Sequence, residues 1–63
     1  MKFIGIKEDR DTGEIEYNEL NFSRQQITCF YKDRYGVYIC TNNGRMFKVH
    51  HTIDELTEKL DVL

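Results

Sequence analysis

Two cysteines and two histidines are the side chains of this sequence best suited to metal binding or nucleophilic catalysis: Cys29, Cys40, His50 and His51. Thiolate sulfur and imidazole nitrogen are the ligands that zinc prefers, and a cysteine beside a histidine can act as a nucleophile. Common zinc motifs, however, pair their ligands two to four residues apart, and neither cysteine has such a neighbour. We therefore expect no metal, no cofactor and no small-molecule substrate, and we expect the cysteines to be small buried hydrophobic residues.

The sequence also lacks the motifs that carry most enzymatic chemistry. It contains no glycine-rich phosphate loop, no nucleophile motif, and no paired carboxylates beyond those that would cap a helix. The sequence therefore predicts that the protein is not an enzyme and has no catalytic residues.

The bulk properties favour one small domain, residues 1–63, with a thin core. A chain of this size buries only about 60% of the surface that its unfolded form exposes, and such domains often gain stability by self-association. The net charge of −2 gives no overall attraction to nucleic acid or anionic membranes. Residues 22–52 nevertheless contain five basic residues and one acid, so the middle of the chain is locally basic.

No stretch of the sequence is typical of a signal peptide or a membrane span. The N-terminal segment has only four residues between Lys2 and Lys7, which is too short for a signal-peptide core. We therefore expect a cytoplasmic protein without membrane contact, in which both cysteines remain thiols. A disulfide between Cys29 and Cys40 is the alternative that thiol titration would test.

Hydrophobic periodicity predicts about five strands and one helix. Short alternating runs at residues 2–8 and 14–18 precede three runs rich in β-forming residues, at 26–32, 37–42 and 45–50. A leucine-patterned segment from residue 53 follows. The expected fold is α+β, a small antiparallel β-meander with one C-terminal α-helix packed on one sheet face.

Two turns set the expected register of the three central strands. The dipeptide Asn43-Gly44 favours a two-residue type I′ turn, which would place Cys40 opposite Phe47. A four-residue loop at 33–36 would place Cys29 opposite Cys40, and Lys32 opposite Val37. The face that we expect the helix to cover would then collect Ile27, Cys29, Tyr31, Tyr38, Cys40, Phe47 and Val49.

The opposite face is the candidate interface. It would present Thr28, Phe30, Lys32, Val37, Ile39, Thr41, Met46, Lys48 and His50. Four of these side chains would make it apolar enough to bind a partner or a second copy: Phe30, Val37, Ile39 and Met46. The alternative is that residues 1–22 fold over this face and bury it.

The helix should begin just after the two histidines. Thr52 as the N-cap and Glu55 three residues later would form a capping box, which gives His51 a structural place before the cap. One apolar stripe follows along the helix: Ile53, Leu56, Leu60 and Leu63.

From Gln26 onward the chain resembles the first half of a LytTR-type DNA-binding domain. The matching stretch is "QITCFYKDRYGVYICTNNGRMFKVHHTIDELTEKL", with hydrophobic residues at comparable places: Ile27, Phe30, Val37, Ile39, Phe47, Ile53, Leu56 and Leu60. That family regulates bacterial transcription by placing loops of a β-rich domain into DNA grooves. The resemblance implies a contact region at loop 32–35, while the family's further contact strands lie beyond the matching stretch.

The candidate contact residues are those suited to phosphate contact or stacking at that end of the sheet: Lys32, Arg34, Tyr35, Lys48 and His50. Our first hypothesis is a small non-enzymatic regulatory interaction module, a homodimer or a binder of a protein partner, that associates through the sheet face or edge. The second is a small LytTR-like DNA-binding transcriptional regulator. A third is a phage or mobile-element protein that binds a host factor.

Overall fold

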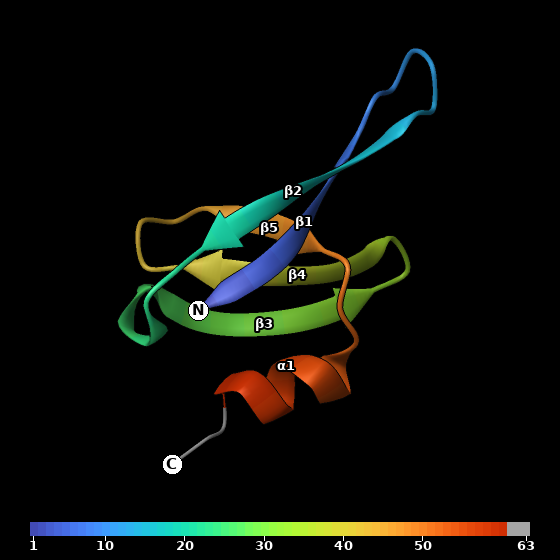
Figure 1. Cartoon of the computed structure of the whole chain (residues 1–63). Helices are drawn as coiled ribbons and strands as arrows, with labels where there is room; N and C mark the ends of the chain where they lie inside the picture. Colours follow the sequence, from blue (N-terminus) through green and yellow to red (C-terminus); the bar gives the residue numbers. More distant parts are fainter. Residues whose placement is uncertain (61–63) are drawn as a thin grey trace.

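The computed structural model describes residues 1–60, which form five strands and a C-terminal helix (Figure 1). The elements are β1 (Lys2–Glu8), β2 (Ile15–Asn21), a 3₁₀ turn η1 (Arg24–Gln26), β3 (Ile27–Asp33), β4 (Gly36–Thr41), β5 (Met46–Val49) and α1 (Ile53–Leu60). The predicted α+β class with a single C-terminal helix is confirmed. Leu63, the last residue of the predicted stripe, lies outside the described residues. The helix α1 is too short to cross a membrane.

The strands form one antiparallel sheet in the order β2-β1-β5-β4-β3. The β1–β2 hairpin is therefore joined to the β3–β4–β5 meander through β1 and β5, where Gly5 lies opposite Val49. Gly5 is needed at this point because a Cβ there would lie 2.5 Å from the Asn18 side chain. As a result, β2 and β3 form the two edges of the sheet, and the hairpin tip projects away from the rest of the molecule (Figure 1).

From Cys29 to Lys32 the β3–β4 register agrees with the sequence prediction, whereas an irregularity between Ile27 and Cys29 places Ile27 opposite Thr41. Cys29 lies opposite Cys40, and Lys32 lies opposite Val37. The connection is tighter than expected, because pairing continues to Asp33 and leaves a two-residue turn. The Asp33 carboxylate accepts hydrogen bonds from the backbone N–H groups of Tyr35 and Gly36, at 2.8 and 3.2 Å, and so stabilises the turn.

The β4–β5 register differs from the prediction by one residue. Cys40 lies opposite Met46, not Phe47. Only Gly44 in this turn has a positive φ, 81°, so the expected type I′ geometry at Asn43 does not form. The Thr41 N–H instead donates to the Arg45 carbonyl, which defines a three-residue loop with Gly44 in the left-handed conformation. A slip of one residue moves every β5 side chain to the other face of the sheet.

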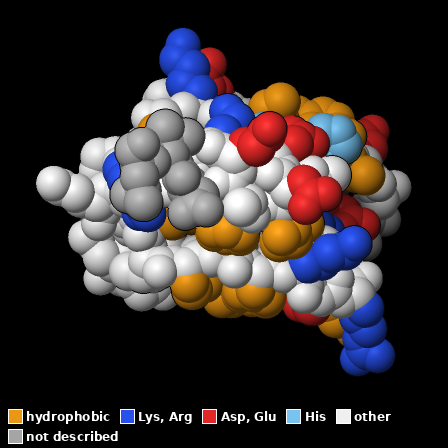
Figure 2. All heavy atoms as spheres, turned by 90° about the horizontal axis from the view of Figure 1, so that it is seen from below, with side chains coloured by type: hydrophobic (Ala, Val, Ile, Leu, Met, Phe, Trp, Pro, Cys, Tyr) orange, Lys and Arg blue, Asp and Glu red, His pale blue; other side chains and the backbone are white. Residues whose placement is uncertain are grey.

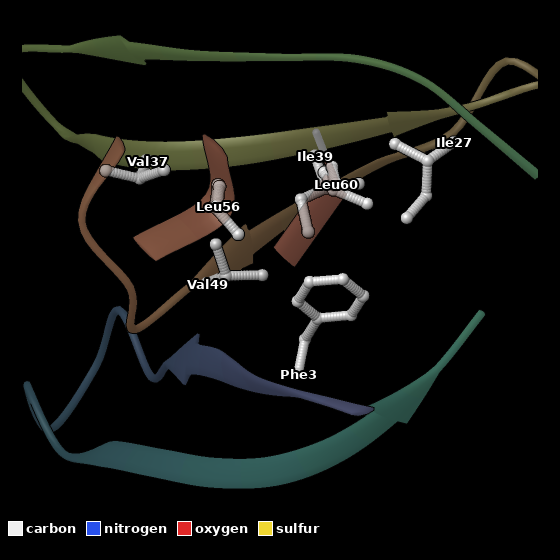
Figure 3. Packing of buried hydrophobic residues seen from close by; sticks show 7 residues of the cluster. All are labelled: Phe3, Ile27, Val37, Ile39, Val49, Leu56 and Leu60. Atoms are coloured by element: carbon white, nitrogen blue, oxygen red, sulfur yellow. The ribbon is translucent and has the colours of Figure 1, made fainter. Parts of the chain in front are cut away.

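Ile27, Phe47 and Val49 lie on the helix-covered face as predicted, but β4 presents Val37 and Ile39 to the helix instead of the predicted Tyr38 and Cys40. The buried cluster is shown in Figure 3 and consists of Phe3, Ile27, Val37, Ile39, Val49, Leu56 and Leu60. With Phe47 and Val49 beside Ile39 and Val37, this face is mainly aliphatic and aromatic, and the one polar residue buried in the described part of the chain, Thr41, is hydrogen-bonded to the Arg45 carbonyl. Leu56 and Leu60 of α1 pack onto it.

The predicted interface of Phe30, Val37, Ile39 and Met46 is therefore wrong as a single exposed surface. Val37 and Ile39 are buried, and Phe30 packs partly buried against them. Met46 points to the opposite face and is 60% exposed.

The N-terminal β1–β2 hairpin helps α1 to bury this face of the sheet, as the alternative prediction allowed. Phe3 is fully buried, and Leu20 and Phe22 pack partly buried against the core. Phe22 bridges Phe3 and Phe47, with ring centroids 6.1 and 5.1 Å away. The core thus depends on both ends of the chain.

The capping box of α1 is confirmed. The Thr52 hydroxyl accepts a hydrogen bond from the Glu55 N–H at 3.1 Å, and the Glu55 carboxylate accepts one from the Thr52 N–H at 3.4 Å. At the other end, the Arg24 Nε–H donates to the Leu60 carbonyl at 2.9 Å. Both ends of the helix are therefore anchored.

Candidate functional site on the outer sheet face

The sheet face that α1 leaves uncovered carries most of the exposed hydrophobic side chains, and we call it the outer face. Directly opposed residues of neighbouring strands share a face, so the register determines its members. They are Ile4, Ile6, Glu8, Ile15, Tyr17, Glu19, Cys29, Tyr31, Tyr38, Cys40, Met46 and Lys48. Figure 2 shows the other side of the molecule, the one that carries α1, where acidic side chains lie at the surface between hydrophobic groups.

Three sulfur atoms follow one another across β3, β4 and β5. Cys40 lies directly opposite Cys29 on one side and opposite Met46 on the other, and we call these three residues the sulfur row. The expectation of buried cysteines is wrong, because Cys29 is exposed and Cys40 only half-buried. A side-chain hydrogen bond with Cys29 raises the pKa of the Cys40 thiol, and partial desolvation adds to the increase.

Two tyrosines flank the sulfur row. The rings of Tyr31 and Tyr38 stack with centroids 5.4 Å apart. The Tyr31 hydroxyl donates to Sδ of Met46 at 3.3 Å. Desolvation, followed by the negative charge of Asp33, raises the pKa of the Tyr31 phenol.

A second apolar group lies on the β1–β2 hairpin. Ile4, Ile15 and Tyr17 share the outer face and are 45%, 54% and 58% exposed; we call these three the hairpin patch. The His50 ring packs edge-on against Tyr17 with centroids 5.2 Å apart. A shallow hollow of about 390 Å³ beside the patch is lined by Phe3, Ile4, Tyr17, His51, Lys59 and neighbouring polar residues.

Charged side chains on this face are largely matched within the chain. Lys2 lies 3.7 Å from Glu19, and Lys48 lies 3.9 Å from Glu8. The stem of Lys48 passes over Gly36, where a Cβ would lie 2.7 Å from the Lys48 Cε. The outer face is therefore apolar and close to neutral, which suits contact with another protein surface better than contact with a polyanion.

The five predicted contact residues do not gather at one site. Arg34 and Tyr35 lie together in the β3–β4 turn, with the guanidinium 5.0 Å from the ring centroid. Lys32 lies opposite Val37 and so shares the helix-covered face, where it is exposed at the margin. Lys48 and His50 belong to the outer face, beside Glu8 and Tyr17.

The histidines lie apart from the cysteines. His51 is bonded to β1 and to the helix cap through both of its ring nitrogens, and His50 contacts the hairpin. Within residues 1–60, no three or more Cys, His, Asp or Glu side chains are grouped so that they could hold a metal ion. A nucleophilic cysteine–histidine pair therefore has no geometric basis in this part of the chain.

Comparison with known proteins identifies no relative: no family model matches the chain, and neither the curated proteins nor the solved structures contain a match. The LytTR-like resemblance therefore stays a prediction. The function has to be argued from the outer face itself.

Sequence reasoning missed both the hairpin patch and the sulfur row. The alternating hydrophobic residues at Ile4, Ile15 and Tyr17 indicated strands, but they gave no sign that nothing would cover them. The sulfur row depends on the β4–β5 register, which the turn dipeptide predicted incorrectly.

Proposed function

We propose that this protein is a small non-enzymatic interaction module that forms a homodimer through its β1–β2 hairpin. The observation that supports the proposal most is the exposure of Ile4, Ile15 and Tyr17 on one face of a projecting hairpin. Contiguous exposed apolar side chains with a polar rim are typical of contact sites. The regulatory role, and a bacterial or phage setting, follow from the sequence hypotheses alone.

The free edge of the hairpin is the second argument for association with another copy of this chain. Among the described residues, β2 pairs only with β1, so its other backbone edge has no strand beside it. Such an edge is a ready template for strand addition from another chain. A two-fold axis that pairs β2 with β2 of a second copy would bring the two hairpin patches to one continuous outer face.

The charges of β2 are compatible with this self-pairing. Glu19 is bonded to Lys2, and Glu16 lies opposite Lys7, so lysines of β1 offset both acids. An antiparallel pairing centred on Asn18 would place Glu16 opposite Leu20 and Tyr17 opposite Glu19 of the second copy. No two glutamates would face each other, which avoids the cost of directly opposed like charges.

Sedimentation velocity over a range of protein concentrations tests the proposal. We expect the wild-type protein to shift from monomer to dimer as the concentration rises, and we expect Tyr17→Lys to remain a monomer. Tyr35→Lys is the matched control, because Tyr35 is also highly exposed but lies in the β3–β4 turn. A wild-type monomer at all concentrations, or an equal loss of dimer in both variants, would contradict the proposal.

The alternative function, a small DNA-binding regulator, is supported by the Arg34–Tyr35 pair. An exposed guanidinium held over an aromatic ring can contact phosphate while the ring stacks on a base. If this function holds, duplex DNA should bind at low salt, and Arg34→Ala should weaken the binding and reduce its salt dependence. The separation of Lys32 from Lys48 and His50 makes this function the second choice.

A further inference from the structure

The sulfur row brings three soft donor atoms to one small area of the outer face. Directly opposed side chains on adjacent strands have Cβ atoms about 4.5–5.5 Å apart, and Cys40 is opposed to both Cys29 and Met46. Cys29 and Cys40 are therefore neighbouring side chains on the same face of β3 and β4.

The position of the Met46 thioether completes the arrangement. Met46 belongs to β5, yet its Sδ accepts a hydrogen bond from the hydroxyl of Tyr31 on β3. The strand between them is β4, so the thioether lies across β4, on the side that carries Cys40. The stacked rings of Tyr31 and Tyr38 form an apolar wall beside the three sulfurs.

We propose that Cys29, Cys40 and Met46 form a binding site for a soft monovalent d¹⁰ cation of the Cu(I) class. The two thiolates are the principal ligands and the thioether is the third. Thiolate and thioether sulfur select Cu(I) over hard cations such as Mg²⁺ and Ca²⁺. Tyr31 acts as a positioning residue, because its hydrogen bond holds the thioether toward the thiols.

Zinc fits this site poorly. Structural zinc sites are tetrahedral and take four nitrogen or thiolate ligands, whereas the sulfur row supplies two thiolates and a thioether. The imidazole of His51 is bonded to Ile4 and Glu55, and that of His50 packs on Tyr17. A soft ion that accepts a low coordination number is therefore favoured over zinc.

Binding involves no change of oxidation state. Each thiol loses one proton as its sulfur bonds to the metal, so one Cu(I) ion and two thiols give a dithiolate complex and two protons. Because ligand protons must be displaced, affinity for the metal should rise with pH.

The test is an anaerobic titration of reduced protein with Cu(I) in competition with bicinchoninate, a chromophoric Cu(I) chelator. We expect one Cu(I) per chain in the wild-type protein. Cys29→Ser and Cys40→Ser should each weaken binding at least about a hundredfold, and Met46→Leu about tenfold, in the range known for changes around metal ligands. Tyr31→Phe should weaken Cu(I) binding by a smaller factor. In the Met46→Leu background, Tyr31→Phe should cause no further loss of affinity.

The control variant is His50→Gln, which removes a potential ligand of the outer face that lies outside the sulfur row. It should bind Cu(I) as the wild type does. Circular dichroism of each variant should show the native fold, since Cys29 and Met46 are exposed. Wild-type affinity in both serine variants, or one Cu(I) per two chains, would overturn the proposal. The titration does not depend on the dimer proposal, because the sulfur row and the hairpin patch share no residue.

Discussion

His51 accepts a hydrogen bond from the Ile4 backbone N–H at 2.9 Å, although 47 positions separate the two residues in the sequence. The same ring places Nδ1 3.2 Å from the Glu55 carboxylate. Because Nε2 accepts the hydrogen bond from Ile4, the proton of the neutral ring lies on Nδ1. The Nδ1–H group then donates a hydrogen bond to the Glu55 carboxylate. One histidine therefore connects the first strand of the sheet to the cap of the helix.

The first prediction concerns this histidine. His51→Ala should lower the free energy of unfolding by about 2 kcal/mol, because it leaves the Ile4 N–H and the Glu55 carboxylate without their partner and removes a side chain packed on Phe3. His50→Ala, at the neighbouring exposed position, should cost less than about 1 kcal/mol. Urea unfolding measures both changes. Equal losses would contradict the role assigned to His51.

The second prediction is a pH dependence that arises at Glu55. Hydrogen bonds from His51 and then from Thr52 lower the pKa of the Glu55 carboxyl below its ordinary value. The folded state therefore favours the carboxylate, and the stability it adds is present above the unfolded pKa, about 4.3, and lost as the pH falls through the folded value.

Unfolding measured between about pH 6 and pH 3 checks this sign. Glu55→Gln should lose stability at pH 6 and approach the wild type at the acidic end. Glu58→Gln, on the same helix, is the matched control and should run parallel to the wild type. A constant gap between wild type and Glu55→Gln over the whole range would refute the assignment.

The third prediction distinguishes the two faces of the sheet. Ile39→Ala should destabilise the protein by about 3 kcal/mol, since Ile39 is completely buried under α1. Met46→Ala, on the outer face, should change the stability of a monomeric sample by less than about 0.5 kcal/mol. Chemical denaturation at low protein concentration makes the comparison. A larger loss of stability in Met46→Ala than in Ile39→Ala would instead support the face assignment expected from the turn dipeptide.

The fourth prediction tests the β4–β5 loop. Gly44 has φ of 81° with open space around it, so a new Cβ would meet strain in the backbone rather than a clash. Gly44→Ala should cost about 1 kcal/mol, and Gly44→Asn should cost less because asparagine tolerates the left-handed conformation. Thermal unfolding of the two variants measures the difference. Identical stability in Gly44→Ala and the wild type would be inconsistent with the observed loop.

Local signals in the sequence predicted local structure well. The capping box at Thr52 and Glu55 and the pairing of Cys29 with Cys40 are confirmed because short-range chemistry determines them. The Asn43-Gly44 dipeptide fits either a two-residue type I′ turn or a three-residue loop, and only the second occurs. That single choice grouped Phe47 and Val49 with Cys40 and Tyr38 of β4, whereas they share a face with Ile39 and Val37, and it therefore assigned Val37 and Ile39 wrongly to an exposed interface.

Long-range contacts had the weakest signals. The pairing of β1 with β5 at Gly5 and Val49 rests on a glycine inside a strand, which indicates close approach without naming the partner. Without that pairing, the position of the hairpin and the exposure of its patch could not be predicted. The candidate site therefore had to come from the structure.

Hydrogen exchange at two protein concentrations tests the central claim, dimerisation through the β1–β2 hairpin, most directly. In concentrated protein the amides of β2 should exchange more slowly than in dilute protein, because the free edge would be paired with a second copy. The amides of β3, the other edge of the sheet, should exchange at the same rate in both samples. Concentration-independent exchange in β2, or protection that appears in β3 instead, would contradict the account.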